Sequence, residues 1–222
     1  MDFESARIKM IDSQVRPNGI TDERLMAAMA AVPRELFVPP GKESLAYMDE
    51  DIEIGAAPGR DCRRYLVEPM TFARMVQLLS LEAEDIVLDV GCATGYSSAI
   101  LSMLAKTVIC LESDPELAAQ ASANLAKMGA ANARVVEGEL GAGYLADGPY
   151  DAICINGRIP EPPLPLLAQL REHGRLVAVV GDHELGRVAL FTRNGGFSVR
   201  YAYDAATQCL PGFDSARPAF AF

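Results

Sequence analysis

The second half of the chain alternates short apolar runs with longer amphipathic stretches. An apolar run such as Val87–Val90 suits a strand buried on both faces of a parallel sheet. Asp114-Pro115 supplies a cap and a first-turn proline for a helix that runs to Gly129, a natural helix stop. Strands that alternate with helices indicate an α/β fold with a doubly wound, mostly parallel sheet. We predict its further strands at Thr107–Glu112, Arg134–Glu137, Asp151–Asn156 and Arg175–Val180.

The pattern changes after the fifth predicted strand. Arg187–Arg193 and Phe197–Tyr203 flank Asn194-Gly195-Gly196, which is a hairpin turn signal. We therefore expect a C-terminal antiparallel hairpin to complete a seven-stranded sheet.

The first 81 residues have a mainly helical pattern. We predict one helix over residues 4–16 and a second that begins after an N-cap at Thr21 and ends before Pro33. Residues 39–64 show poor periodicity and many charges, so we interpret them as a surface loop. An amphipathic helix follows over Pro69–Leu81. No repeat or linker interrupts the sequence, and we expect one domain over residues 1–222, with residues 1–81 as a helical appendage and residues 82–222 as the core.

Composition narrows the class of protein. Half of the 222 residues are hydrophobic, and 30 acidic against 20 basic side chains give a net charge of −10. That balance disfavours nucleic acid and anionic membranes as partners, because both require a basic face. Five irregularly spaced cysteines suggest a reduced chain, and neither a signal peptide nor a transmembrane run is apparent. We expect a cytoplasmic protein.

The stretch Val87–Tyr96 carries the first candidate chemistry. Gly91 and Gly95 bracket a turn between strand and helix, where backbone N–H groups are free to meet a ligand. The spacing differs from the G-x-G-x-x-G of dinucleotide enzymes, and Asp89 places a carboxylate where an ammonium group could bind. Asp-x-Gly-x-x-x-Gly after a strand resembles motif I of S-adenosylmethionine-dependent methyltransferases.

Polar residues follow the next strands. Glu112 ends the second strand, where nucleoside-binding α/β folds present a carboxylate to the ribose hydroxyls. Glu139 follows the third strand, where methyltransferases often place an acid beside adenine, although Glu137 competes for that role. Asn156 ends the fourth strand and either faces the ligand or forms a turn before Gly157. The likeness implies a cofactor site made of Asp89, Gly91, Cys92, Ala93, Thr94, Gly95, Tyr96, Glu112, Ser113, Gly138, Glu139 and Asn156.

Other chemistries find no support in the sequence. His173 and His183 have no partner at metal-ligand spacing, so we expect no metal site. No Ser–His–Asp pattern or phosphate-binding lysine motif is present, and we assign no catalytic residue.

The chain as a whole resembles the protein-L-isoaspartate O-methyltransferase family. The likeness covers residues 10–181 and includes Met10-Ile-Asp-Ser-Gln14, Val32-Pro-Arg-Glu-Leu-Phe-Val-Pro39 and Gly174-Arg-Leu-Val-Ala-Val-Val-Gly181. It implies methyl transfer from S-adenosylmethionine to the α-carboxylate of isoaspartate in damaged proteins, which is protein repair. The implied partner is a protein or peptide that bears isoaspartate; the oligomeric state is left open.

The loop before Pro69 departs from the family. Its family pattern is roughly Gly-Gln-Thr-Ile-Ser-Gln-Pro, and here Tyr65, Val67 and Glu68 stand for the threonine, serine and glutamine that would contact the substrate. Arg60, Arg63 and Arg64 either bind a carboxylate in compensation or form a solvated basic loop. The departure leaves two alternatives open: a methyltransferase with a different acceptor, and a non-catalytic S-adenosylmethionine-binding protein.

Overall fold

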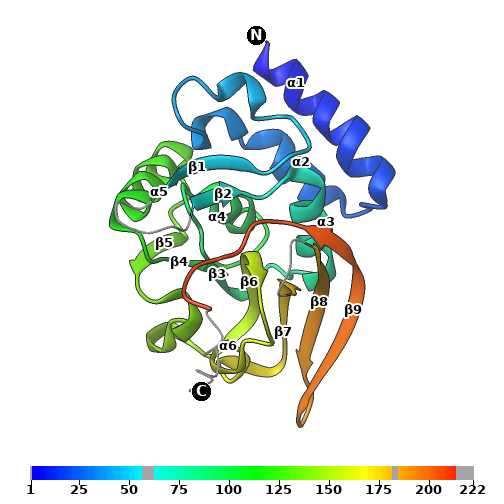
Figure 1. Cartoon of the computed structure of the whole chain (residues 1–222), viewed down its shortest axis with the longest axis vertical. Coiled ribbons are helices and arrows are strands. Elements are labelled where there is room, and N and C mark those ends of the chain that lie inside the picture. The colour runs from blue at the N-terminus through cyan, green and yellow to red at the C-terminus, as the bar shows by residue number, and fades with distance from the viewer. Residues whose placement is uncertain (1, 57–62, 182–184, 214–222) are drawn as a thin grey trace, which may run out of the picture.

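The computed structural model describes residues 2–56, 63–181 and 185–213, and its centre is one mostly parallel sheet (Figure 1). The strand order is β5-β4-β3-β6-β7-β8-β9, with parallel pairing from β5 to β7 and antiparallel pairing of β8 and β9. The predicted seven-stranded sheet with a C-terminal hairpin is confirmed. Its strands are β3 (Ile86–Val90), β4 (Thr107–Glu112), β5 (Ala133–Glu137), β6 (Tyr150–Ile159), β7 (Leu170–Val180), β8 (Leu185–Arg193) and β9 (Phe197–Ala206).

The strand order reverses beside β3, which has β4 on one side and β6 on the other. In open α/β sheets, ligands bind outside the carboxyl ends of the strands at such a switch point. The turn after β3 and the ends of β4 and β6 therefore meet where a ligand is expected.

Helices cover both faces of the sheet. α4 (Tyr96–Ser102) begins directly after the turn, and the Asp114 side chain caps α5 (Pro115–Met128) by accepting from two backbone N–H groups, as the sequence predicts. Gly129 ends α5 in a left-handed conformation. The remaining covering helices are α3 (Pro69–Leu79) and the short α6 (Leu164–Leu167).

The N-terminal appendage is helical, with one boundary placed differently from the prediction. α1 (Phe3–Met10) continues into a π-helical turn over Ile11–Val15. α2 (Glu23–Ala31) is capped by Asp22, not Thr21, because the Asp22 carboxylate accepts from the N–H groups of the following turn. The Thr21 N–H instead donates to the Gln77 side chain of α3 at 2.7 Å, which connects the start of α2 with α3.

The prediction of a surface loop over residues 39–64 holds for the irregular residues 39–51 and is wrong for residues 52–56 and 63–64. The segment contains β1 (Ile52–Ala56), which pairs antiparallel with β2 (Arg63–Leu66) in a separate two-stranded sheet. The poor periodicity has a structural reason, since the pairing register shifts between Glu53 and Gly55. Figure 1 shows this hairpin above the end of β3 and β4 at which the motif turn lies.

The segment after β9 returns across the same end of the sheet (Figure 1). It is held against β6 by backbone hydrogen bonds, from Arg158 N–H to the Gln208 carbonyl (2.9 Å) and from Leu210 N–H to the Arg158 carbonyl (2.8 Å). Two segments far from the motif turn in sequence, β2 and residues 207–213, therefore lie over it. Within the part of the chain that the structure describes, no helix is long and apolar enough to cross a membrane.

Candidate functional site

The turn between β3 and α4 has a backbone that requires glycine. Gly91 and Gly95 have φ values of 73° and 94°, in the left-handed region that glycine adopts freely. A Cβ on Gly95 would lie 3.3 Å from the Ala121 Cα, so this glycine also allows α5 to approach closely. Ala93 is left-handed as well, with φ of 54° and no glycine to relieve it. Strain of this kind is characteristic of functional turns.

Asp89 and Asn156 lie together beneath this turn. The fully buried Asp89 carboxylate accepts from the hydroxyls of Ser97 (2.7 Å) and Ser98 (2.5 Å) and from the Asn156 amide (2.6 Å). Burial raises the pKa of Asp89, and these hydrogen bonds oppose the rise. Three donors already hold the carboxylate, and Asn156 faces the site rather than forming a solvent turn. Binding of an ammonium group by Asp89 stays a prediction.

Glu112 organises the other side of the turn. Its carboxylate is fully buried and accepts from the backbone N–H groups of Ala93 (2.8 Å), Ser113 (2.8 Å) and Asp114 (3.1 Å). A buried carboxylate with several charge-assisted hydrogen bonds is part of the fold and is not solvated at the strand end.

Arg64 of β2 completes the environment of Glu112. Its Nη1 lies 2.5 Å from one carboxylate oxygen and its Nη2 lies 2.9 Å from the other, in a bidentate pair. Both side chains are buried, with exposures of 4% for Arg64 and 0% for Glu112. The solvated-loop alternative is therefore wrong for Arg64. Arg63 points elsewhere and pairs with Glu53 at 3.1 Å, while Arg60 lies outside the described residues.

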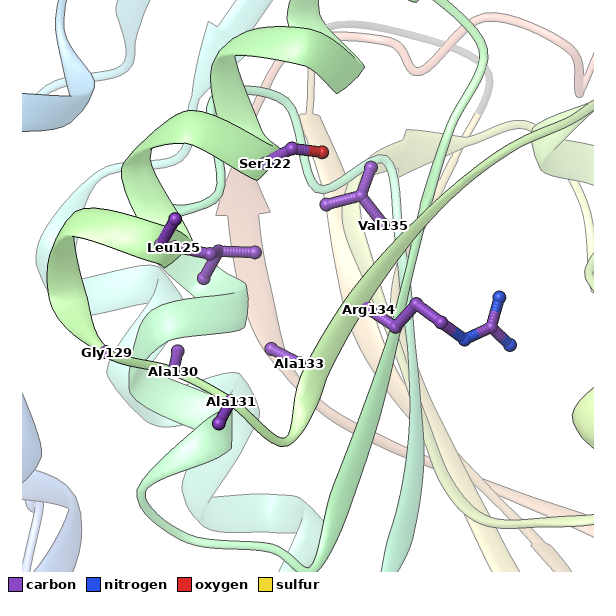
Figure 2. Close-up of a pocket in the computed structure, with 9 residues that line it drawn as sticks. Ser122, Leu125, Gly129, Ala130, Ala131, Ala133, Arg134 and Val135 are labelled. Carbon is purple, nitrogen blue, oxygen red and sulfur yellow. The ribbon is translucent and has the colours of Figure 1, made fainter.

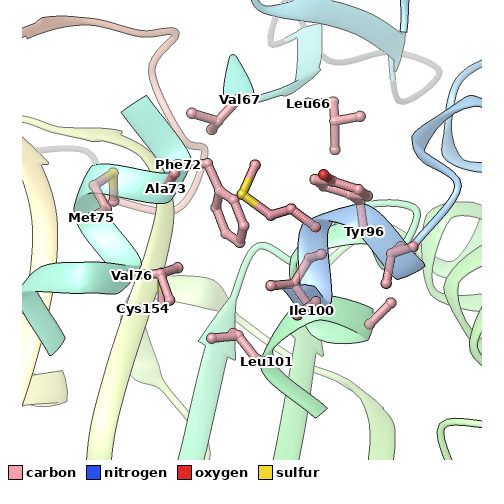
Figure 3. Packing of buried hydrophobic residues seen from close by; sticks show 14 of the residues in the cluster. Leu66, Val67, Phe72, Ala73, Met75, Val76, Tyr96, Ile100, Leu101 and Cys154 are labelled. Atoms are coloured by element: carbon pink, nitrogen blue, oxygen red, sulfur yellow. The ribbon is translucent and has the colours of Figure 1, made fainter. Parts of the chain in front are cut away.

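The remaining residues of the motif face the protein interior. The Thr94 hydroxyl donates to the Phe37 carbonyl at 2.6 Å, and burial raises the pKa of the Cys92 thiol well above its usual value. Tyr96 packs edge-on against Phe37 and lies under the Arg34 guanidinium, 4.6 Å from ring centroid to Cζ. Figure 3 shows Tyr96 with its hydroxyl toward Leu66 and Val67. These side chains support the turn from the protein interior.

The predicted adenine side is more open. Gly138 N–H donates to the Glu112 carbonyl at 3.0 Å, which places the end of β5 beside the end of β4. Glu139 is exposed and lines an open groove of about 590 Å³ together with Gly212 and Phe213, whereas Glu137 does not line it. Of the two acids considered from sequence, Glu139 is the one beside a groove.

The loop before α3 is held from below by Arg34. This fully buried arginine donates from Nε to the Ala46 carbonyl and from Nη2 to the Val67 carbonyl, both at 2.8 Å. Arg34 was absent from the sequence-based site, although it belongs to the Val32–Pro39 segment that is most specific to the family resemblance. Its burial could not be predicted from the sequence, because an arginine is usually exposed at the surface.

Val67 and Glu68 take different roles in that loop. Val67 is 6% exposed and packs in the hydrophobic cluster with Leu66 and Phe72 (Figure 3). Glu68 precedes α3, its carboxylate accepts from the Thr71 hydroxyl, and its N–H donates to Asp51 at 2.8 Å. Burial raises the pKa of Glu68, and the nearby Asp49 and Asp51 carboxylates act in the same direction.

Two cavities border the site differently. A closed one of about 10 Å³ lies between the loop and the motif turn, lined by residues that include Tyr65, Val67, Gly91 and Asn156. An open groove of about 510 Å³ runs along Glu50, Asp51, Glu68 and Arg158 to residues 206–208. The loop therefore separates the buried motif turn from an accessible groove.

A third pocket is not part of this site. Figure 2 shows it between α5 and β5, where Ala130, Ala131 and Ala133 line it. Ala133 pairs with Val108, whereas Glu112 pairs with Glu137 at the other end of the two strands. Among the described residues, no group of three or more His, Cys, Asp or Glu side chains is arranged to hold a metal ion.

The comparisons with known proteins agree on one family. Its model, described as protein-L-isoaspartate(D-aspartate) O-methyltransferase, matches residues 6–215. The protein-L-isoaspartate O-methyltransferase of Methanoregula boonei is 41% identical over 189 residues, which are 85% of this chain and 84% of that protein. The corresponding protein of Methanoculleus marisnigri is 40% identical over 80% of this chain and 78% of its own length.

Solved structures show the same fold. A protein-L-isoaspartate O-methyltransferase superimposes with a TM-score of 0.81 at 21% identity, covering 93% of this chain and 67% of that one. A putative protein-L-isoaspartate O-methyltransferase of Plasmodium falciparum, in complex with S-adenosyl-L-homocysteine, gives 0.75 at 18% identity, covering 96% and 99%. On these findings the chain belongs to the protein-L-isoaspartate(D-aspartate) O-methyltransferase family of S-adenosylmethionine-dependent methyltransferases.

Proposed function

We propose that this protein methylates the free carboxylate of isoaspartyl residues in damaged proteins, with Asp89, Glu112 and the turn between them as the cofactor site. The observation that carries the proposal is the Glu112 carboxylate, fully buried at the end of β4 and held by three backbone N–H groups beside a strained glycine turn. This carboxylate suits a nucleoside, because a fixed carboxylate accepts hydrogen bonds from the vicinal hydroxyls of a ribose.

The chain's contribution to the reaction is positioning. When bound, S-adenosylmethionine supplies an activated methyl group on a sulfonium centre. A carboxylate acceptor is already a nucleophile at neutral pH, so the residues need only hold the two groups in near-attack geometry and exclude water. The buried turn and the cap over it support this role, and no general base is required of the side chains.

The cofactor side is built by residues from three strand ends. Glu112 is assigned to the ribose hydroxyls, with Ser113 and Gly138 as its backbone neighbours, and Glu139 to the adenine edge at the open groove. Asp89 and Asn156 hold the turn at Gly91–Gly95, whose glycines let the ligand approach the backbone. Cys92, Ala93, Thr94 and Tyr96 complete that turn.

The acceptor side is the loop at Tyr65, Val67 and Glu68, next to the groove that Asp51 and Arg158 line. Val67 offers no hydroxyl to a substrate carboxylate, and an ionised Glu68 would repel it. Loss of one charge-assisted hydrogen bond costs about 1.5–3 kcal/mol, which is roughly ten- to a hundred-fold in rate when that bond forms mainly in the transition state.

We therefore expect weak methylation of a standard isoaspartyl peptide by the wild-type protein, and normal cofactor binding. The combined substitution Val67→Ser and Glu68→Gln restores the family's polar pattern and should raise the rate. The measurement is radiolabelled methyl transfer to the peptide at saturating cofactor, with the matching aspartyl peptide as control. Strong wild-type turnover that the double substitution leaves unchanged would show that this loop is not the acceptor site.

We propose in addition that the protein is located in the reducing environment of the cytoplasm. Cys92, Cys110 and Cys154 are buried and free, and burial raises the pKa of each thiol, so they act as small core side chains. The partner is a protein or peptide that carries isoaspartate.

A further inference from the structure

Arg64 occupies the side of Glu112 that a nucleoside requires. The backbone N–H groups of Ala93, Ser113 and Asp114 hold the carboxylate from the protein side, and the Arg64 guanidinium adds one donor to each oxygen, which gives five donors. An ionised carboxylate has about four lone-pair sites. With Arg64 in place, the vicinal hydroxyls of a ribose have no free acceptor on Glu112.

The same side chain covers the glycine turn. Leu210 Cδ1 lies 2.8 Å and Arg64 Nη2 lies 3.3 Å from the point where a Cβ of Gly91 would be, so the two side chains together fill the space that the missing side chain leaves. The neighbouring cavity has a volume of about 10 Å³, which is no more than the roughly 10–15 Å³ needed to hold a single water molecule. The hairpin and a bound cofactor therefore cannot share this space in the present arrangement.

Ile52, Ile54 and Leu66 of the β1–β2 hairpin pack in the hydrophobic cluster that it shares with the main sheet, so the part that can change its partner is the Arg64 side chain. β1 and β2 pair only with each other, in a two-stranded sheet separate from the seven-stranded one. Arg63, the preceding residue, is 64% exposed and pairs with Glu53 within the hairpin. Among the described contacts between β2 and the motif turn, the Arg64–Glu112 pair is the charged one.

A buried guanidinium that gives up its carboxylate needs another anion. Removal of one partner from a buried ion pair leaves an uncompensated charge, which is strongly unfavourable. Arg64 lies next to Tyr65 and the loop at Val67, on the acceptor side of the turn. The methyl acceptor of the proposed function is itself a carboxylate, and arginine binds carboxylates in a bidentate fork.

We propose that Arg64 exchanges partners during the reaction: it holds Glu112 in the free protein, and after the nucleoside takes Glu112 it binds the carboxylate of the acceptor. Because Glu112 competes for Arg64, this contact only partly offsets the hydroxyl that Val67 lacks, and the exchange favours binding of the cofactor before the acceptor. This inference rests on the proposed function for the identity of the acceptor. The competition between Arg64 and a nucleoside for Glu112 rests on the structure.

The exchange predicts opposite effects of one substitution on the two ligands. Arg64→Ala removes the competitor for Glu112, so S-adenosylhomocysteine should bind about ten-fold more tightly if the paired form makes up about nine-tenths of the free protein. The same change removes the acceptor contact, and the KM for an isoaspartyl peptide should rise at least ten-fold. Arg63→Ala is the matched control and should change neither quantity.

Isothermal titration calorimetry with S-adenosylhomocysteine gives the first value, and steady-state methyl transfer gives the second. Arg64→Lys serves if the alanine variant does not fold, because a lysine keeps the charge but loses the bidentate geometry; it should shift both values in the same directions. Weaker or unchanged S-adenosylhomocysteine binding in either folded variant overturns the exchange. An unchanged KM overturns the acceptor role of Arg64. Absence of S-adenosylhomocysteine binding by the wild-type protein would instead overturn the proposed function.

Discussion

At the scale of single residues, the site contains carboxyl groups that the fold treats in different ways. Glu112 is fully paired with cationic and N–H donors, whereas burial raises the pKa of Asp51, Glu68 and Asp89. A raised pKa in the folded state means that folding favours the protonated carboxyl. The stability that such a group contributes is fully present below the pKa of the unfolded chain and is lost as the pH rises through the folded pKa.

Glu68 allows this to be tested with little disturbance. Glu68→Gln keeps an acceptor for the Thr71 hydroxyl and replaces the ionisable carboxyl group with an amide that stays neutral. We expect the variant to be more stable than wild type at pH 7–8, with the difference shrinking to near zero below about pH 4, where an unfolded glutamate is itself protonated. Urea denaturation at a series of pH values measures it.

Glu50→Gln is the control, because Glu50 lines the same groove but its side chain is exposed. A Glu68→Gln variant that loses stability as the pH rises, relative to wild type, would show that the ionised carboxylate is favoured in the folded protein.

At the scale of elements, Arg34 connects the segment after α2 with the loop before α3. Its side chain donates to two buried backbone carbonyls, those of Ala46 and Val67. Arg34→Ala leaves both acceptors buried without a donor, at about 1–3 kcal/mol each, so the free energy of unfolding should fall by roughly 2–6 kcal/mol. Denaturant titration by circular dichroism is the measurement.

The comparison for this prediction is Arg16→Ala, since Arg16 is half exposed and makes surface ion pairs with Asp12 and Glu23. Such pairs contribute about 0–1 kcal/mol. Equal losses for the two variants would refute the role of Arg34 as the connection between the segment after α2 and the loop before α3.

Sequence patterns predicted the elements whose signals are local. The strand Thr107–Glu112, the Asp114 cap, the Gly129 stop and the hairpin around Asn194 all rest on residues within a few positions of each other, and all are observed. The β1–β2 hairpin was missed because its register shift breaks the alternation that identifies a strand.

The same distinction between local and long-range signals applies to the candidate site. Asp89, the glycine turn and Glu112 are found from spacing within one βαβ unit, and the structure brings them together. The Arg64–Glu112 pair joins residues 48 positions apart, and Arg34 reaches Val67 across 33. Contacts of that kind depend on tertiary packing, so no local pattern in one sequence contains them.

At the scale of the whole molecule, the appendage and the core share one hydrophobic cluster. Leu25 and Met29 of α2 belong to the same buried cluster as Val87 of β3 and Val177 of β7. We propose on this basis that residues 1–222 form a single domain, in which residues 1–81 are not an independent unit. A domain boundary would instead show a linker with few contacts across it.

The proposal predicts one cooperative unfolding transition. Native-state hydrogen exchange followed by mass spectrometry should give the same opening free energy, within about 1 kcal/mol, for peptides that cover α2 and peptides that cover β4, because both unfold only when the shared cluster is lost. The chain contains no tryptophan, so segment-resolved exchange is a better probe than intrinsic fluorescence. Peptides from β9, whose outer face is largely exposed, serve as the internal comparison and should exchange through smaller openings. Protection of α2 that is lost at much lower denaturant than that of β4 would show that the appendage unfolds by itself, and the division at residue 81 would then be a true domain boundary.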